Sequence, residues 1–116
     1  MRAQFERYEQ ALRAHDLAAL NGFFVPSPDT VRFGLAEQNY GYEAIATYRR
    51  DALRVHPERQ LQHTVIATFG ENVACVSTEF TDPGMPGLGR QTQTWVRTAA
   101  GWKILAAHVS ASKATR

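Results

Sequence analysis

The sequence predicts an α+β fold in which a curved, mainly antiparallel sheet and three helices enclose one interior pocket. Three observations predict this class. Helical periodicity is confined to the first half of the chain, alternating strand patterns fill the second half, and 116 residues suffice for one hydrophobic core. Helices followed by a meander of strands differ from the regular alternation that produces parallel sheets. We therefore expect a single domain over residues 1–116.

Three helices are expected first, because apolar residues recur there at the spacing of one helical face. The first helix shows this stripe in Phe5, Tyr8 and Leu12. Asp16 is placed to cap the second helix, and Pro57 lies just past the end of the third. The three expected ranges are residues 3–14, 17–24 and 42–55.

Strands are expected where apolar and polar residues alternate between clusters of turn residues. The segments 34–41 and 82–87 are rich in turn residues, so both are expected to be loops. Most of the sheet should therefore come from the second half of the chain. The expected strands are residues 30–33, 59–69, 73–81, 89–98 and 102–110.

The composition is that of a globular protein and argues against several other classes. Hydrophobic residues make up 44% and charged residues 21%, which argues against disorder. The net charge is only +2 and no basic cluster is present, so no nucleic-acid partner is expected. No apolar run approaches the roughly 20 residues that span a bilayer. We expect no membrane contact and, by default, a cytoplasmic location.

Cofactor and metal sites have no support in the sequence. The single cysteine excludes an intramolecular disulfide and a multi-cysteine metal site. The four histidines show no ligand spacing with carboxylates or with one another. Phosphate-binding glycine loops, nucleophile elbows and paired-carboxylate signatures are missing too. We therefore expect neither a metal nor a cofactor.

Tyr8 and Arg32 are the first candidate pair, and each has two interpretations. Tyr8 is either a core tyrosine or a phenol in the pocket wall. An ordinary phenol has a pKa of about 10, so a base near neutral pH would need a nearby cation. Arg32 points opposite to Val31 and Phe33 on its strand, so it faces either solvent or the pocket. Its planar fork suits a carboxylate.

Four further polar or aromatic side chains are candidates for the pocket lining. Arg49 lies on the inner face of the third helix, although such arginines usually extend outward. Gln93 and Trp95 share one face of the strand over residues 89–98. His108 shares a face with apolar residues of the last strand, where it is either a core histidine or a pocket residue.

Three segments of the chain carry a distinctive combination of residues. They are Tyr8–Leu12 running to His15–Leu17, Val31–Gly34 with Ala36-Glu37 and Tyr40-Gly41, and Gly89–Trp95 through Gly101–Ile104 to Ala107–Ser110. Together they resemble the AtzH-like family of the nuclear transport factor 2-like (NTF2-like, also SnoaL-like) superfamily, which includes oxalurate catabolism proteins. The resemblance extends over nearly the whole chain.

The resemblance implies a cone-shaped roll, usually a homodimer, with a role in bacterial breakdown of urea-like nitrogen compounds. For members that are enzymes, it implies hydrolysis of a carbon–nitrogen bond in a small carboxylated urea. The matching functional positions are Tyr8 and Arg32. Phe33 departs from the family, which often has tyrosine there. That departure concerns the identity of the substrate more than the fold.

Two function hypotheses follow. In the first, Arg32 binds a substrate carboxylate and lowers the pKa of Tyr8, which then transfers a proton. In the second, the chain is a non-catalytic small-acid-binding or accessory protein of an amidase pathway, because fold alone does not prove activity. A ketosteroid-isomerase-type proton shuttle ranks last, since its interior base would have to be Glu37 or Glu79. The expected substrate-binding residues are Arg49, Gln93, His108, Glu37 and Trp95.

Overall fold

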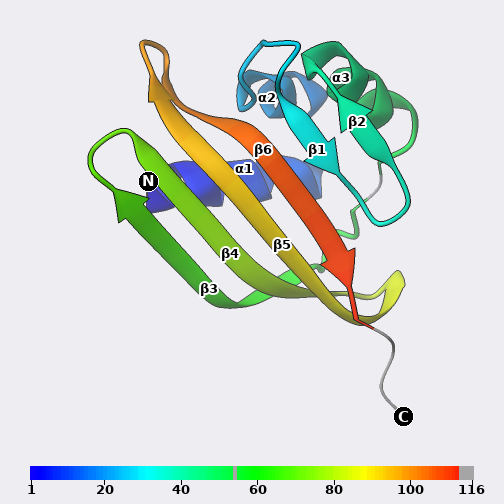
Figure 1. Cartoon of the computed structure of the whole chain (residues 1–116). Coiled ribbons are helices and arrows are strands. Elements are labelled where there is room, and N and C mark those ends of the chain that lie inside the picture. Colours follow the sequence, from blue (N-terminus) through cyan, green and yellow to red (C-terminus); the bar gives the residue numbers. More distant parts are fainter. Residues whose placement is uncertain (54, 113–116) are drawn as a thin grey trace.

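A computed structural model describes residues 1–53 and 55–112 and has the predicted α+β architecture (Figure 1). Six strands form one curved, unclosed sheet in the order β2-β1-β6-β5-β4-β3. The helices lie on one side of this sheet, and its other side carries no helix among the described residues (Figure 1). The elements are α1 (Arg2–Ala14), α2 (Leu17–Gly22), β1 (Val31–Phe33), β2 (Gln38–Tyr40), α3 (Tyr42–Asp51), β3 (Gln60–Phe69), β4 (Val73–Asp82), β5 (Met85–Thr98) and β6 (Gly101–Ala111).

Helix α1 is amphipathic and ends where the sequence predicts. Its buried face includes Phe5, Tyr8 and Leu12, the stripe that predicted the helix. His15 then adopts a left-handed conformation with φ 54, which ends the helix. The side chain of Asp16 accepts a hydrogen bond from Ala19 N at 3.2 Å and so caps α2, as expected. None of the described helices is both long and apolar enough to cross a membrane.

Three differences from the predicted elements are larger than two residues. Helix α3 ends at Asp51, and residue 54 of its expected range lies outside the described residues. Segment 34–41 was expected to be loop but contains β2, which pairs antiparallel with β1. It was missed because a three-residue polar strand has no hydrophobic alternation. The expected loop 82–87 is shorter, because Asp82 pairs with Met85 and both strands extend into it.

A bulge in β6 changes which of its side chains face the helices. Thr94 pairs with Ala106, but Trp95 pairs with Ile104, so β6 has one extra residue between them. Such a bulge reverses the inward and outward alternation. Ile104 is therefore buried under the helices, whereas Ala106 and His108 are exposed on the helix-free side. The expectation that these three residues share a face is wrong.

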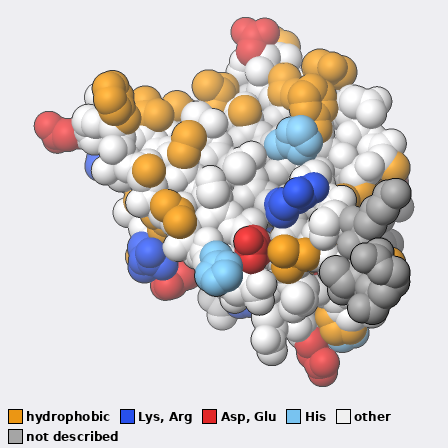
Figure 2. All heavy atoms as spheres, turned by 60° about the horizontal axis from the view of Figure 1, so that its bottom comes forward, with side chains coloured by type: hydrophobic (Ala, Val, Ile, Leu, Met, Phe, Trp, Pro, Cys, Tyr) orange, Lys and Arg blue, Asp and Glu red, His pale blue; other side chains and the backbone are white. Residues whose placement is uncertain are grey.

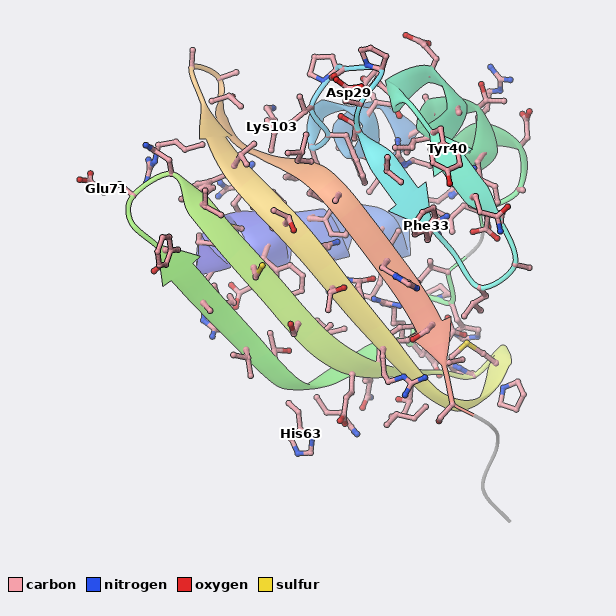
Figure 3. All side chains as sticks on the ribbon, viewed as in Figure 1. Asp29, Phe33, Tyr40, His63, Glu71 and Lys103 are labelled. Carbon is pink, nitrogen blue, oxygen red and sulfur yellow. The ribbon has the colours of Figure 1, made fainter. Side chains whose placement is uncertain are left out.

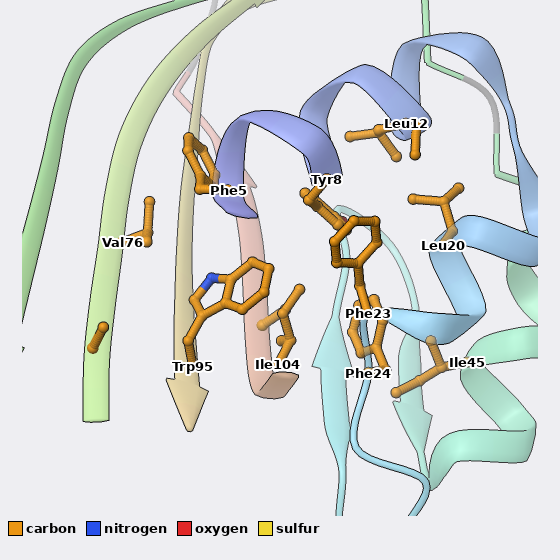
Figure 4. Packing of buried hydrophobic residues seen from close by; sticks show 13 residues of the cluster. Phe5, Tyr8, Leu12, Leu20, Phe23, Phe24, Ile45, Val76, Trp95 and Ile104 are labelled. Carbon is orange, nitrogen blue, oxygen red and sulfur yellow. The ribbon is translucent and has the colours of Figure 1, made fainter. Parts of the chain in front are cut away.

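The core lies between α1, the sheet and the α2–α3 pair, and Trp95 is at its centre (Figure 4). The Tyr8 ring packs edge-on against Phe23 at 5.6 Å and against Trp95 at 6.1 Å, measured between ring centroids. Such aromatic pairs contribute about 0.5–1.5 kcal/mol beyond burial. This packing fixes α1 against β5, so that the rest of the α1 face borders a cavity.

Candidate functional site

A cavity of about 480 Å³ lies between α1, β1, the end of α3 and the helix-covered side of the sheet. Pockets of about 300–1,000 Å³ hold small organic ligands. Apolar side chains make up part of the wall, including Leu12 of α1 and Phe80 of β4. The polar lining residues are Tyr8, Arg32, Glu37, Tyr48, His56, Arg59, Asp82, Gln91 and Gln93.

Arg32 lies in the cavity wall and is held there by two acceptors. Its Nη1 donates to Glu37 Oε2 at 2.6 Å and to Asn39 Oδ1 at 3.1 Å. Its guanidinium carbon lies 4.8 Å from the ring centroid of Tyr48. Burial would raise the pKa of Glu37, but the hydrogen bond and charge of Arg32 outweigh it and lower that pKa. The structure therefore brings together the predicted residues Arg32 and Glu37 as an ion pair.

Gly34 makes room for this ion pair. A Cβ atom at Gly34 would lie 1.5 Å from Glu37 Oε2 and 2.8 Å from Arg32 Nη1. Both distances are far below van der Waals contact. The glycine of the Val31–Gly34 segment thus has a physical reason, which the sequence pattern alone did not supply.

Tyr8 also lines the cavity, and its ring is fixed by the core. Its hydroxyl makes no hydrogen bond to any residue that the structure describes, although the ring is buried. Burial, followed by the charge of Glu9, raises the pKa of Tyr8 above 10.0, and the opposing charges of Arg49 and Arg32 are weaker. The charge of Arg32 lowers the pKa of Tyr8, as expected, but burial outweighs this effect, so the net shift is upward and Tyr8 is not a base near neutral pH. The phenol is therefore neutral at pH 7 and keeps its proton.

A buried network of Glu9, Arg59 and Gln91 forms another part of the site, and the sequence analysis missed Glu9 and Arg59. Arg59 Nε donates to Glu9 Oε1 at 3.1 Å, and Arg59 Nη2 donates to Glu9 Oε2 at 3.2 Å. Nη2 also donates to Gln91 Oε1 at 3.1 Å, and Gln91 Nε2 donates to Glu9 Oε2 at 3.3 Å. A signal was present, because Glu9 is four residues after Phe5 on the inner stripe of α1.

Gln93 and Trp95 have different places although they share one face of β5. Gln93 lines the cavity, whereas Trp95 is fully buried in the core and contacts Tyr8. The interpretation of Trp95 as a ligand contact is therefore wrong. Its large ring fills the space between α1 and the sheet, and its indole Nε1 donates to Gln93 Oε1 at 3.0 Å.

Arg49 points inward but does not reach the cavity wall. It donates to the side chain of Asn21, and its guanidinium carbon lies 4.6 Å from the ring centroid of Phe24. None of the described carboxylates pairs with it, and burial lowers its pKa. Because α3 packs on α2 at this point, Arg49 lies outside the residues that line the cavity, and its contact with a ligand stays a prediction.

His108 lies on the helix-free side, beyond the β6 bulge, so its expected place in the pocket is wrong. Its ring packs edge-on against Phe33 at 5.7 Å, and Phe33 contacts Tyr40 at 5.9 Å (Figure 3). His108, His63 and Glu79 border a separate shallow hollow there. Figure 2 shows basic, acidic and histidine side chains close together on the surface, among scattered apolar ones.

Comparisons with known proteins agree with this architecture. The profile of the family described as AtzH-like matches residues 1–115. A cystatin-like fold protein from Burkholderia xenovorans LB400 is 49% identical, with 99% of this chain and 90% of that chain covered and a TM-score of 0.93. A protein with unknown function from Pectobacterium atrosepticum SCRI1043 is 45% identical, with 96% and 87% covered and a TM-score of 0.90.

More distant similarity shows the fold alone. An NTF2-like superfamily protein from Salmonella enterica serovar Typhimurium LT2 is 20% identical, with 98% of this chain and 89% of that chain covered and a TM-score of 0.78. No curated protein matches the chain.

Proposed function

This chain belongs to the AtzH-like family of the NTF2-like superfamily. From that membership we propose that its cavity binds a small carboxylated urea and hydrolyses it, as a step of bacterial nitrogen catabolism. The observation that carries the proposal is the Arg32 guanidinium in the wall of the cavity that Tyr8 also lines. A cavity of about 480 Å³ has room for a ligand of this size.

Arg32 binds the ligand carboxylate in this proposal. Glu37 and Asn39 both engage Nη1, which fixes the guanidinium and leaves the rest of the fork to meet a planar carboxylate. A ligand that also contacted Nη1 would compete with Glu37 at 2.6 Å. The fixed geometry favours a ligand that approaches the free edge of the fork.

Tyr8 acts as the proton donor. Because burial raises its pKa, the phenol stays protonated at neutral pH and serves as an acid rather than a base. Water adds to the carbonyl carbon, the carbon–nitrogen bond breaks, and Tyr8 gives its proton to the departing nitrogen. A proton from the attacking water returns to Tyr8. The products are a carbamic or carboxylic acid and ammonia or an amine.

The pairing of Glu9 and Glu37 favours a second candidate, a non-catalytic protein that binds a small acid or assists an amidase. Glu9 is paired with Arg59 and Glu37 with Arg32, so neither is a free base. The same pairing disfavours a proton shuttle of the ketosteroid-isomerase type. Glu79, the other residue considered for that role, lies on the helix-free side of the sheet, away from the cavity.

Thermal stabilisation followed by product analysis distinguishes these functions. Small carboxylates and carboxylated ureas are screened for an increase in the melting temperature, and the stabilising compounds are then tested for release of ammonia or carbon dioxide. Stabilisation with release supports the hydrolase. Stabilisation without release supports the binding protein, and no stabilisation by any carboxylate contradicts both.

A homodimer formed through the helix-free side of the sheet is part of the same proposal. Phe69 and Val65 are 87% and 60% exposed there, so pairing would remove apolar surface from water. Light scattering during size exclusion measures the mass. A monomer at micromolar concentration, or a dimer unaffected by Phe69→Glu and Val65→Glu, contradicts this assembly.

A further inference from the structure

The amide of Gln93 has only one orientation that is compatible with its neighbour Trp95. An indole Nε1–H is a donor and never an acceptor, so the group it meets must be an oxygen. Trp95 Nε1 lies 3.0 Å from Gln93 Oε1, and both side chains are buried. The other end of the amide, the Nε2 group with its two N–H donors, therefore points away from the indole.

This Nε2 group faces the cavity. Gln93 lines the cavity, and its Nε2 has no hydrogen-bond partner among the described residues. Among the described residues, every side-chain nitrogen or oxygen that is fully shielded from solvent has a hydrogen-bond partner. The unpartnered Nε2 is consequently exposed to the cavity, where a ligand atom can accept from it.

The indole of Trp95 also fixes the position of a second donor, the hydroxyl group of Tyr8. Trp95 packs edge-on against the Tyr8 ring at 6.1 Å, and the Tyr8 hydroxyl has no protein partner among the described residues. Tyr8 and Gln93 thus present an O–H and two N–H groups to the cavity, in addition to the Arg32 guanidinium. If Trp95 did not fix the amide, Gln93 could turn by 180° and present an acceptor instead.

We infer that Trp95 is a positioning residue that holds the Gln93 amide with its N–H donors toward the cavity. The cavity therefore prefers a ligand that has a carbonyl oxygen near its carboxylate to a ligand that has an amino group at the same place. This inference rests on the proposed function, because the ligand is oriented by its carboxylate on Arg32. The ligand class is a carboxylate that bears a urea or amide carbonyl. A ligand with a guanidino group there would place N–H donors against the N–H donors of Gln93.

A matched pair of small molecules tests the inference. Ureidoacetate and guanidinoacetate share one skeleton and one carboxylate, but the carbonyl oxygen of the first is an NH₂ group in the second, which also carries a positive charge on its guanidinium. The change of the preference in the Trp95 variant below separates the hydrogen bond from this charge. Calorimetric titration of the full chain should give about tenfold or greater preference for ureidoacetate, the effect of one hydrogen bond made or lost. Gln93→Glu replaces the donor by an acceptor of the same shape and should reverse the preference.

Two more variants separate positioning from folding. Trp95→Phe keeps an aromatic core but removes the hydrogen bond that fixes the Gln93 amide. The ratio of the affinities for ureidoacetate and guanidinoacetate should therefore fall toward one. A merely structural role would weaken both ligands together and leave their ratio unchanged. Arg32→Lys should weaken both ligands and retain the preference for ureidoacetate.

The outcomes distinguish the inference from the proposed function. If the wild type binds neither compound, the proposed function and the inference both fail. If it binds both compounds and Gln93→Glu keeps the wild-type ratio, the inference alone is overturned. Should Trp95→Phe fail to fold, the Gln93→Glu ratio decides, because that substitution changes no core volume.

Discussion

Nη1 of Arg32 lies 2.6 Å from Oε2 of Glu37, in a space that exists only because residue 34 is glycine. The pair connects β1 to the turn before β2 and borders the cavity. A ligand carboxylate therefore meets a guanidinium whose orientation is already fixed, and a fixed side chain loses less conformational entropy on binding. The same pair makes the stability of this wall dependent on pH.

The first prediction concerns that dependence on pH. Burial opposes ionisation of Glu37, but the hydrogen bond and charge of Arg32 bring its pKa below the ordinary 4.5. A carboxyl whose pKa is lower when folded contributes stability above pH 4.5 and loses it as the pH falls through the folded value. The melting-temperature difference between wild type and Glu37→Gln should therefore be largest near pH 7 and shrink in acid. A difference that is constant with pH contradicts the ion pair.

Arg32→Lys should weaken ligand binding about tenfold or more while the protein stays folded. Lysine keeps the charge but loses the planar fork that matches a carboxylate. Calorimetric titration with any carboxylate that stabilises the wild type gives the measurement. Arg50→Lys is the matched control, because Arg50 is exposed and pairs with Asp51 away from the cavity. Equal affinity in both variants would remove Arg32 from carboxylate recognition.

Gly34→Ala should destabilise the fold by about 1–3 kcal/mol, in the range of other overpacking substitutions. The added methyl group would overlap Glu37 Oε2 and force the ion pair apart. Urea denaturation measures the change in the free energy of unfolding. Gly22→Ala is the control, because no atom lies within 4 Å of a Cβ at Gly22. If both substitutions cost the same, the close approach at Gly34 has no energetic importance.

The sequence predicted the family and the fold because periodicity and motifs are local properties. The stripe through Phe5, Tyr8 and Leu12 was sufficient for α1. The three segments quoted for the resemblance led to the family that the profile over residues 1–115 confirms. Arg32 was predicted with two possible orientations, and only its pairing with Glu37 shows which one the chain adopts.

The errors in the site come from properties that are not local. The place of His108 depends on one extra residue in β6, and alternation in a single strand does not reveal a bulge. Trp95 was misplaced because Trp95 and Gln93 share the inward face of β5, but only Trp95 is covered by the helices. Alternation along one strand does not show which inward residues lie in the core and which line the cavity. Arg59 was missed because its partner Glu9 is 50 residues away in the sequence.

Glu9→Gln should cost about 3–5 kcal/mol, the range for breaking one partner of a buried ion pair. The side chains of Glu9 and its partner Arg59 are each 3% exposed. The substitution therefore leaves the Arg59 guanidinium buried without the counter-charge of Glu9. Urea denaturation at pH 7 is the measurement. Glu6→Gln on the exposed side of α1 is the control and should change stability by less than about 0.5 kcal/mol. Similar losses in both would mean that the Glu9 pair is not stabilising.

Tyr8→Phe should abolish most turnover without weakening the fold. The hydroxyl has no protein partner among the described residues, and the ring contacts with Phe23 and Trp95 remain. Loss of a general acid lowers kcat by about 10²–10⁴-fold. Ammonia release on a stabilising carboxylated urea is measured beside the melting temperature. Tyr40→Phe, 66% exposed on the helix-free side, should keep wild-type turnover. Full turnover in Tyr8→Phe with an unchanged melting temperature would remove Tyr8 from the chemistry and leave it a core residue.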